Sequence, residues 1–345
     1  MRLGIDSFVE MLADGRPIAE RSRDRVAQLI EEIELADRVG LDSYGIGEHH
    51  REEYVASSPA VLLAAAATRT ERIRLTSAVT VLSSDDPVRV FQDFATLDLV
   101  SNGRAEIIVG RGSFIESYPL FGFDLKNYDE LFSEKLDLLL QLRDEVNVHW
   151  EGKHRASLSG QGVWPRPVQP VLPIRLGVGG TPNSFARAGM LGLPLTVAII
   201  GGEPHRFRPL IDLYREAGKR AGHAESLDVA VHCIGYVAET DQRAGDELWP
   251  AYSVTFNRIG KERGWGPTTR AGFDAQRGPT GAFVVGSPET AAKKLRHIDE
   301  VLGGVSQVSL MMSGGPLSHN KLLRSIELLG NEVHPRVQEE SAVVA

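Results

Sequence analysis

Short apolar segments alternate with longer amphipathic segments along the whole chain. In residues 23–40, apolar side chains recur at the three- and four-residue spacing of a helix face, and Gly40 marks the end of that pattern. The apolar segments on either side of it are short, as buried strands are. The same pattern along the chain predicts eight strands, at 3–8, 42–50, 72–82, 104–112, 173–180, 193–200, 228–239 and 305–312.

Amphipathic segments separate these strands and predict helices. Three of them begin with a capping residue followed by proline at the first helical position, and the capping residues are Ser58, Asp86 and Ser287. The predicted helices lie at 23–40, 58–70, 85–101, 128–143, from 181 onward, and at 203–222, 242–259, 287–303 and 317–337.

Two stretches interrupt the alternation. Residues 146–173 are rich in Trp, Gly and Pro and predict irregular structure. Residues 260–282 have weak periodicity and many glycines, which favours a long mobile loop or lid over a linker between domains. Both therefore read as insertions, after the fourth and the seventh strand–helix units.

Alternating strands and helices imply a parallel sheet with right-handed crossovers. Eight such units suit an α/β fold, a single (β/α)8 TIM barrel that spans 1–345 with those two insertions. An open doubly wound sheet is the alternative, but it usually carries a glycine-rich dinucleotide fingerprint after its first strand, and residues 3–15 have none.

Composition narrows the class of protein further. The chain of 345 residues carries a formal charge of −8 without any basic run, which argues against a nucleic-acid partner. A single cysteine, Cys233, rules out a disulfide within the chain, and we expect it to be a small buried hydrophobe. No stretch has the length of apolar sequence that a bilayer span needs, and no signal peptide stands out, so a cytoplasmic protein without a membrane partner is expected.

In a barrel of this kind, chemistry belongs at the carboxyl ends of the strands. Gly179, Gly180, Thr181 and Ser184 lie where the fifth strand meets its helix, so backbone N–H groups and two hydroxyls could hold a phosphate there. A plain helix start, with Thr181 as cap and proline after it, explains much of the same pattern without a ligand.

Arg111 stands between glycines at the end of the fourth strand. Such an arginine suits an anion across the barrel mouth, and a salt bridge to an acidic neighbour such as Glu116 is the structural alternative. Because the fourth and fifth strands are neighbours in a barrel, Arg111 and the residues Thr181 and Ser184 could bind the same phosphate.

The motif GEHH, residues 47–50, follows the second strand. A metal site needs three or four ligands, and His149, His154, His205 and His232 show no spacing that would complete one, so we expect no metal. We also expect His49 and His50 to diverge, because successive strand residues point to opposite faces. One histidine is a candidate to act on a bound substrate or cofactor, while the other is expected to cap or to pair with a carboxylate.

Taken together, these segments resemble the bacterial-luciferase-like family of flavin-dependent monooxygenases. GLDSYGIGEHH, the third and fourth units from RIRLTSAVTV to IIVGRGS, PIRLGVGGTPNSFARAG and VGSPETAAKKL carry the resemblance, in the family's order and over nearly the whole chain. It is weakest at 146–170 and 260–282.

The resemblance implies roles for particular residues. His49 would be the histidine that handles the flavin hydroperoxide, and a non-proline cis peptide would fall at Ala78–Val79 under the isoalloxazine ring. Arg111 would meet the flavin phosphate, with Gly180, Thr181 and Ser184 contributing from the fifth unit. Gly110 stands where luciferase has a reactive cysteine, Gly180 where it has a glutamate, and Ile199 where it has an aromatic residue, so light emission and an aldehyde substrate are not expected.

The function implied is oxygenation of a small organic substrate by O2 and reduced FMN, which a separate reductase supplies. Deazaflavin-dependent hydride transfer on the same fold, and flavin binding without catalysis, are the alternatives. The resemblance also suggests a homodimer.

Overall fold

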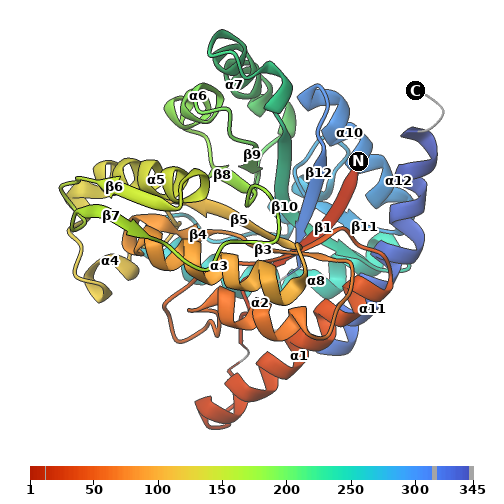
Figure 1. Ribbon diagram of the computed structural model, residues 1–345. Helices are drawn as coiled ribbons and strands as arrows, with labels where there is room; N and C mark the ends of the chain where they lie inside the picture. The colour runs from red at the N-terminus through yellow and green to blue at the C-terminus, as the bar shows by residue number, and fades with distance from the viewer. Residues whose placement is uncertain (12, 313–316, 342–345) are drawn as a thin grey trace.

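The structure, a computed structural model, describes residues 1–11, 13–312 and 317–341. In these residues eight parallel strands close into a barrel that helices surround (Figure 1). The strands follow one another around the barrel in chain order, and β12 pairs with β1 to close it. The prediction of a single (β/α)8 barrel is confirmed.

The strands are β1 Arg2–Ser7, β2 Ser43–Ile46, β3 Arg74–Ser77, β4 Thr80–Val81, β5 Ala105–Gly110, β6 Asn147–Trp150, β7 Leu158–Gly162, β8 Ile174–Val178, β9 Leu195–Ala198, β10 Val229–Val237, β11 Val284–Gly286 and β12 Gln307–Met311. The helices are α1 Ile18–Arg38, α2 Pro59–Ala67, α3 Pro87–Ser101, α4 Ser117–Leu120, α5 Tyr128–Asp144, α6 Pro182–Met190, α7 Arg208–Arg220, α8 Asp241–Arg263, α9 Arg270–Arg277, α10 Pro288–Leu302, α11 His319–Leu328 and α12 His334–Ser341. Strands β1, β2, β3, β5, β8, β9, β10 and β12 form the barrel.

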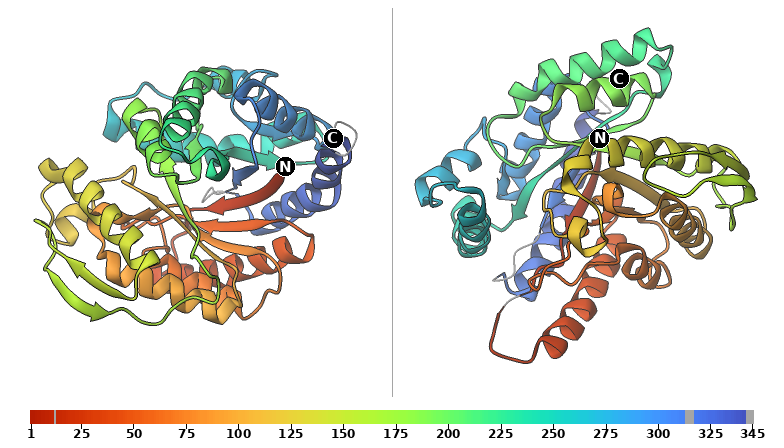
Figure 2. Two further views of the ribbon diagram at one scale, coloured as in Figure 1. Left: turned by 45° about the horizontal axis from the view of Figure 1, so that its top comes forward. Right: turned by 90° about the vertical axis from the view of Figure 1, so that its left-hand side faces the viewer.

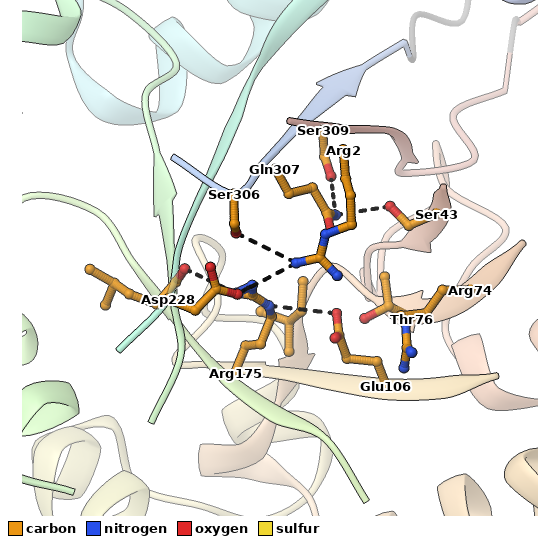
Figure 3. Close-up of polar contacts among 12 residues, drawn as sticks. Arg2, Ser43, Arg74, Thr76, Glu106, Arg175, Asp228, Ser306, Gln307 and Ser309 are labelled. Carbon is orange, nitrogen blue, oxygen red and sulfur yellow. Dashed lines mark hydrogen bonds and ion pairs between the residues drawn. The ribbon is translucent and has the colours of Figure 1, made fainter. Parts of the chain in front are cut away.

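The amino end of the barrel is closed by a polar network (Figure 3). On β8, Arg175 forms ion pairs with Glu106 of β5 and with Asp228, which also lies 3.5 Å from Arg2. On β12, Gln307 donates hydrogen bonds to Ser43 and Ser309, which lie nearby in Figure 3. Side chains of the barrel interior thus fill this end of the barrel.

Of the three predicted helix caps, two form the expected hydrogen bonds. The Asp86 carboxylate accepts from the N–H groups of Val88 and Arg89, and the Ser287 hydroxyl accepts from that of Thr290, so both caps are confirmed. Ser58 precedes α2 as expected, but its side chain makes no capping hydrogen bond. Cys233 is buried in β10, and burial raises the pKa of its thiol to about 12, as suits a core residue.

We had expected irregular structure at 146–173, the first insertion, and this prediction is wrong for part of the segment. Strands β6 and β7 form an antiparallel hairpin, with a register shift between Val148 and His149. Both views of Figure 2 place it at the outer edge of the molecule, beside α5. Most of its side chains are exposed, so the hairpin lacks the buried alternation that predicts a strand from sequence.

The second insertion is also more regular than expected. Helix α8 continues to Arg263, and 260–282 contains α9, whose cap Thr269 accepts from the N–H of Gly272 and whose buried side chain is Phe273. One buried anchor is too few to produce a readable helical period. The short strand β11, which we did not predict, follows and pairs with the end of β10. The role of 260–282 as a mobile lid stays a prediction.

Three predicted elements end early or break. Strand β2 stops at Ile46, so GEHH lies beyond it. The strand expected at 72–82 breaks after Ser77, and β4 resumes at Thr80. The terminal helix is divided by a π-helical turn at Leu329–Val333.

Candidate active site

A cavity of about 460 Å³ opens at the carboxyl end of the barrel strands. Its walls come from alternate residues of the strands, from the loops that follow them, and from one face of α8, where Leu248, Tyr252, Phe256 and Ile259 recur at helical spacing. Most of the surface that they present is apolar, and the lining includes Phe8, Tyr54, Phe114, Tyr252, Phe256 and Trp265. The cavity therefore suits an aromatic or aliphatic ligand.

Glycines in β2 and directly after it make room for side chains in β1 and directly after it. A Cβ added to Gly45 would lie 2.1 Å from Oδ1 of Asp6, and one added to Gly47 would lie 2.2 Å from the Phe8 ring. Both contacts are impossible without movement of the neighbouring side chain. Packing therefore explains both glycines of the GIG sequence before Glu48.

His49 projects into the cavity within a cage of aromatic rings. Its imidazole lies 4.7 Å from the Phe8 ring, 4.5 Å from Tyr54 and 4.9 Å from Phe114, measured between ring centroids. Burial, with smaller contributions from His50 and Arg51, lowers its pKa to about 3. Nε2 is buried and has no hydrogen-bond partner among the described residues. A neutral imidazole with a free nitrogen thus faces the cavity.

His50 turns the other way and pairs with a carboxylate, as expected. Its Nε2 lies 2.8 Å from Oε1 of Glu48, whose Oε2 accepts a hydrogen bond from the backbone N–H of Val81. The two histidines diverge, but our reason was wrong, because they lie beyond the strand. The divergence is due instead to the loop, in which the backbone N–H of His49 donates to the carbonyl of Ala56. Within the described residues, no group of three or more His, Cys, Asp or Glu side chains could hold a metal ion.

The peptide bond between Ala78 and Val79 is cis, as the resemblance implied, and both residues line the cavity. The Val79 side chain lies against the ends of β5 and β8. A Cβ added to Gly110 would come within 2.7 Å of it, and one added to Gly177 within 2.8 Å. Glycines on two neighbouring strands thus allow Val79 to form part of the cavity wall.

Arg111 lines the cavity and contacts Ser184, which does not line it, although 73 positions separate the two residues in the sequence. Nη2 of Arg111 donates to the Ser184 hydroxyl at 3.3 Å, and the guanidinium stacks over the Tyr128 ring at 4.9 Å. It also forms a salt bridge to an acidic residue, as the structural alternative supposed, but the partner is Asp129 and not Glu116. Glu116 instead pairs with Arg51, 3.3 Å away.

Arg111 and the start of α6, which contains Ser184, form what we call the rim of the cavity. Thr181 occupies the N-cap position, lines the cavity and makes no capping hydrogen bond with its side chain. Gly180 is exposed and does not line the cavity, and a Cβ added to Gly179 or Gly180 would meet no atom within 4 Å. These glycines are thus not explained by packing, and they leave the backbone before the helix open to a ligand.

Sequence reasoning missed a second histidine in the cavity. His232 lies on β10, with Nδ1 2.6 Å from Oδ2 of Asp6, and both residues line the cavity. No spacing signal connects residues 226 positions apart in the sequence. The only available signal was their placement on strands with inward-facing alternate positions. Glu10 was missed as well; its carboxylate accepts from Thr255 and Arg258 of α8 and ties that helix to the loop after β1.

The fold and this site define an α/β barrel with an apolar cavity, beside which Arg111 and the start of α6 lie together. The sequence model described as luciferase-like monooxygenase matches residues 2–304. The chain belongs to that family, a family of flavin-dependent oxidoreductases, and the resemblance inferred from sequence is confirmed.

Of two curated relatives, one is named as a monooxygenase and the other is uncharacterised. The chain is 26% identical over 326 residues to limonene 1,2-monooxygenase of Rhodococcus erythropolis, which covers 90% of this chain and 81% of that protein. It is 32% identical over 154 residues to the uncharacterised protein y4wF of Sinorhizobium fredii, and this match spans only 44% of the length of each.

Solved structures share the fold. The oxygenating constituent of 3,6-diketocamphane monooxygenase from Pseudomonas putida, in complex with FMN, superposes with a TM-score of 0.78 at 21% identity and covers 98% of both chains. The coenzyme F420-dependent tetrahydromethanopterin reductase from Methanopyrus kandleri superposes with a TM-score of 0.73 at 20% identity, covering 97% of this chain and 99% of that one. None of the helices in the described part of the chain is long and apolar enough to cross a membrane.

Proposed function

We propose that this protein is an FMN-dependent monooxygenase that uses O2, and reduced FMN from a separate flavin reductase, to oxygenate a small apolar organic substrate. The observation that carries the proposal is the meeting of Arg111, Ser184 and the start of α6 at the rim of an apolar cavity that contains the neutral His49. The relative whose structure contains FMN supports the same cofactor.

The rim fits a single phosphate group. Arg111 offers guanidinium donors beside the Ser184 hydroxyl, and the N–H groups at the start of α6 add partial positive charge. Asp129, the present partner of Arg111, has a side chain that is 77% exposed, so it can move into water when an anion binds. Asp6, Glu10 and Glu48 also line the cavity, which therefore favours a neutral ring system and a neutral substrate over a second anion.

Bound in this cavity, reduced FMN would supply the electrons that activate O2. The protein's part is to bind, orient and keep water out. Phe8, Tyr54 and Phe114 surround His49, so its Nε2 can exchange a hydrogen bond with a ligand in a site of low polarity. With a pKa of about 3, the imidazole stays uncharged at neutral pH and adds no charge beside the reacting atoms.

Stopped-flow mixing of the protein and reduced FMN with oxygenated buffer tests the proposal. We expect bound FMN to reoxidise at least tenfold more slowly than free FMN, and addition of substrate to change that rate. Reoxidation at the rate of free FMN would refute the proposal.

A second measurement separates the alternatives. Fluorescence titration with FMN and with coenzyme F420 compares the cofactors, and tighter binding of F420 would favour hydride transfer, the reaction class that F420-dependent relatives suggest. If His49→Ala reoxidised bound FMN like the wild type, with exposed His205→Ala as the matched control, flavin binding without catalysis would be favoured. The proposal includes the expected homodimer, which light scattering checks.

A further inference from the structure

Three polar residues that line the cavity, Asp6, Thr196 and His232, form what we call its polar floor. Among the described residues that line the cavity, Asp6 and Thr196 each have a buried oxygen without a hydrogen-bond partner, Oδ1 and Oγ1 respectively. His232 hydrogen-bonds to the other carboxylate oxygen of Asp6 through Nδ1. All three residues are more than nine-tenths buried, with exposures of 1%, 7% and 8% for Asp6, Thr196 and His232. Unpartnered polar atoms are costly when buried, so a ligand that pairs with them would be recognised.

The three residues occupy inward positions on β9, β10 and β1; β9 and β10 are neighbours, and β12 separates β10 from β1. His232 on β10 pairs in register with Ala198 on β9, and Thr196 is the next inward position on that strand. Asp6 on β1 reaches His232 across the barrel interior and holds the ring through Nδ1. The Phe8 ring lies between the two histidines, with its centroid 4.7 Å from His49 and 6.1 Å from His232. The floor is therefore a different part of the cavity from the His49 cage.

The floor offers mainly hydrogen-bond acceptors. When the Asp6 carboxylate is ionised it can only accept, and Nδ1 of His232 then carries the hydrogen of their hydrogen bond. In the neutral imidazole, Nε2 is then an acceptor, and Oδ1 of Asp6 is a second one. The Thr196 hydroxyl can donate or accept. This set matches a ligand hydroxyl, which donates to a nitrogen or carboxylate oxygen and accepts from threonine.

The geometry points to Asp6, Thr196 and His232 as the residues that select and orient the substrate, which we infer to be an apolar molecule with a hydroxyl group. Thr196 and His232 would contact that hydroxyl, and Asp6 is in addition a positioning residue for the His232 ring. This inference rests on the proposed function, because it names the class of molecule that the proposed monooxygenase takes.

Three probes of one ring size test it: cyclooctane, cyclooctanol and cyclooctanone, titrated calorimetrically into the protein without flavin. We expect cyclooctanol to bind at least tenfold more tightly than cyclooctane, which corresponds to about 1.4 kcal/mol. His232→Phe and the nearly isosteric Thr196→Val should each reduce that ratio to less than threefold without weakening the hydrocarbon.

The Asp6→Asn variant distinguishes a positioning role from a structural one. Its amide oxygen can still accept from Nδ1 of His232, but its NH2 group places a donor where Oδ1 now offers an acceptor. We therefore expect the preference to move from cyclooctanol toward cyclooctanone. The matched control is Thr76→Val, since Thr76 is buried in β3 but does not line the cavity, and this variant should keep the wild-type ratio.

Equal affinity of the wild type for cyclooctanol and cyclooctane would overturn the inference. So would a wild-type ratio in both His232→Phe and Thr196→Val, provided that their circular dichroism spectra show folded protein. Since the titrations contain no flavin, these results are independent of FMN reoxidation. If the protein prefers the alcohol but does not slow FMN reoxidation, the proposed function is refuted and this inference is not. If it slows reoxidation but does not prefer the alcohol, this inference is refuted and the proposed function is not.

Discussion

The low pKa of His49 makes stability depend on pH in a way that can be measured. The group titrates at 6.5 in its ordinary state and at about 3 when folded, chiefly because burial disfavours the imidazolium. The unfolded chain therefore takes up a proton below pH 6.5 that the folded chain refuses. The stability that neutral His49 contributes is complete above pH 6.5 and is lost progressively as the pH falls toward 3.

Each pKa unit corresponds to about 1.4 kcal/mol, so the fall from pH 7 to pH 5 should cost about 2 kcal/mol through this one group. Many carboxylates titrate in the same range, and a comparison of variants cancels their effect. The assay is urea unfolding followed by tryptophan fluorescence, on the wild type and on His49→Gln at both pH values. The free energy of unfolding of the wild type should fall by about 2 kcal/mol more than that of His49→Gln.

His205→Gln is the control, because the His205 side chain is 57% exposed. This variant should follow the wild type at both pH values. If the gap between wild type and His49→Gln stayed constant to within about 0.5 kcal/mol, burial would not hold His49 neutral, and the reasoning about its free nitrogen would be wrong.

Two further predictions concern the rim and the packing. Arg111→Gln should weaken FMN binding roughly 10- to 100-fold, because a charge-assisted hydrogen bond contributes about 1.5–3 kcal/mol. The affinity for riboflavin, which has no phosphate, should change by no more than about twofold. Fluorescence titration measures both affinities, and equal losses for the two flavins would mean that Arg111 does not bind the phosphate. Gly45→Ala should lower the free energy of unfolding by about 1–3 kcal/mol, because its Cβ would lie 2.1 Å from Oδ1 of Asp6. Asp6→Ala in the same chain should recover part of that loss, and additive costs in the double variant would exclude this clash as the cause.

Most residues of the candidate site could be selected individually from the sequence. His49 was selected from GEHH, and Arg111, Thr181 and Ser184 from the ends of two strands that neighbour each other in any barrel of this order. Their meeting at one rim follows from parallel strands, whose carboxyl ends share one edge. The ion-pair partner of Arg111 could not be chosen in this way, because Asp129 and Glu116 are both near in sequence and only the path of the chain before α5 places Asp129 beside it.

The sequence by itself determined the barrel, its strand order, most of its helices and the end that carries chemistry. Those features depend on hydrophobic period, capping residues and short-range turns, which are local properties of a chain. The tertiary structure alone decided the pairing of Asp6 with His232, the neutrality of His49 and the wall that α8 builds. Burial and long-range contact produce all three, since a side chain's pKa and its partners depend on what the fold places around it, which no local pattern of residues records.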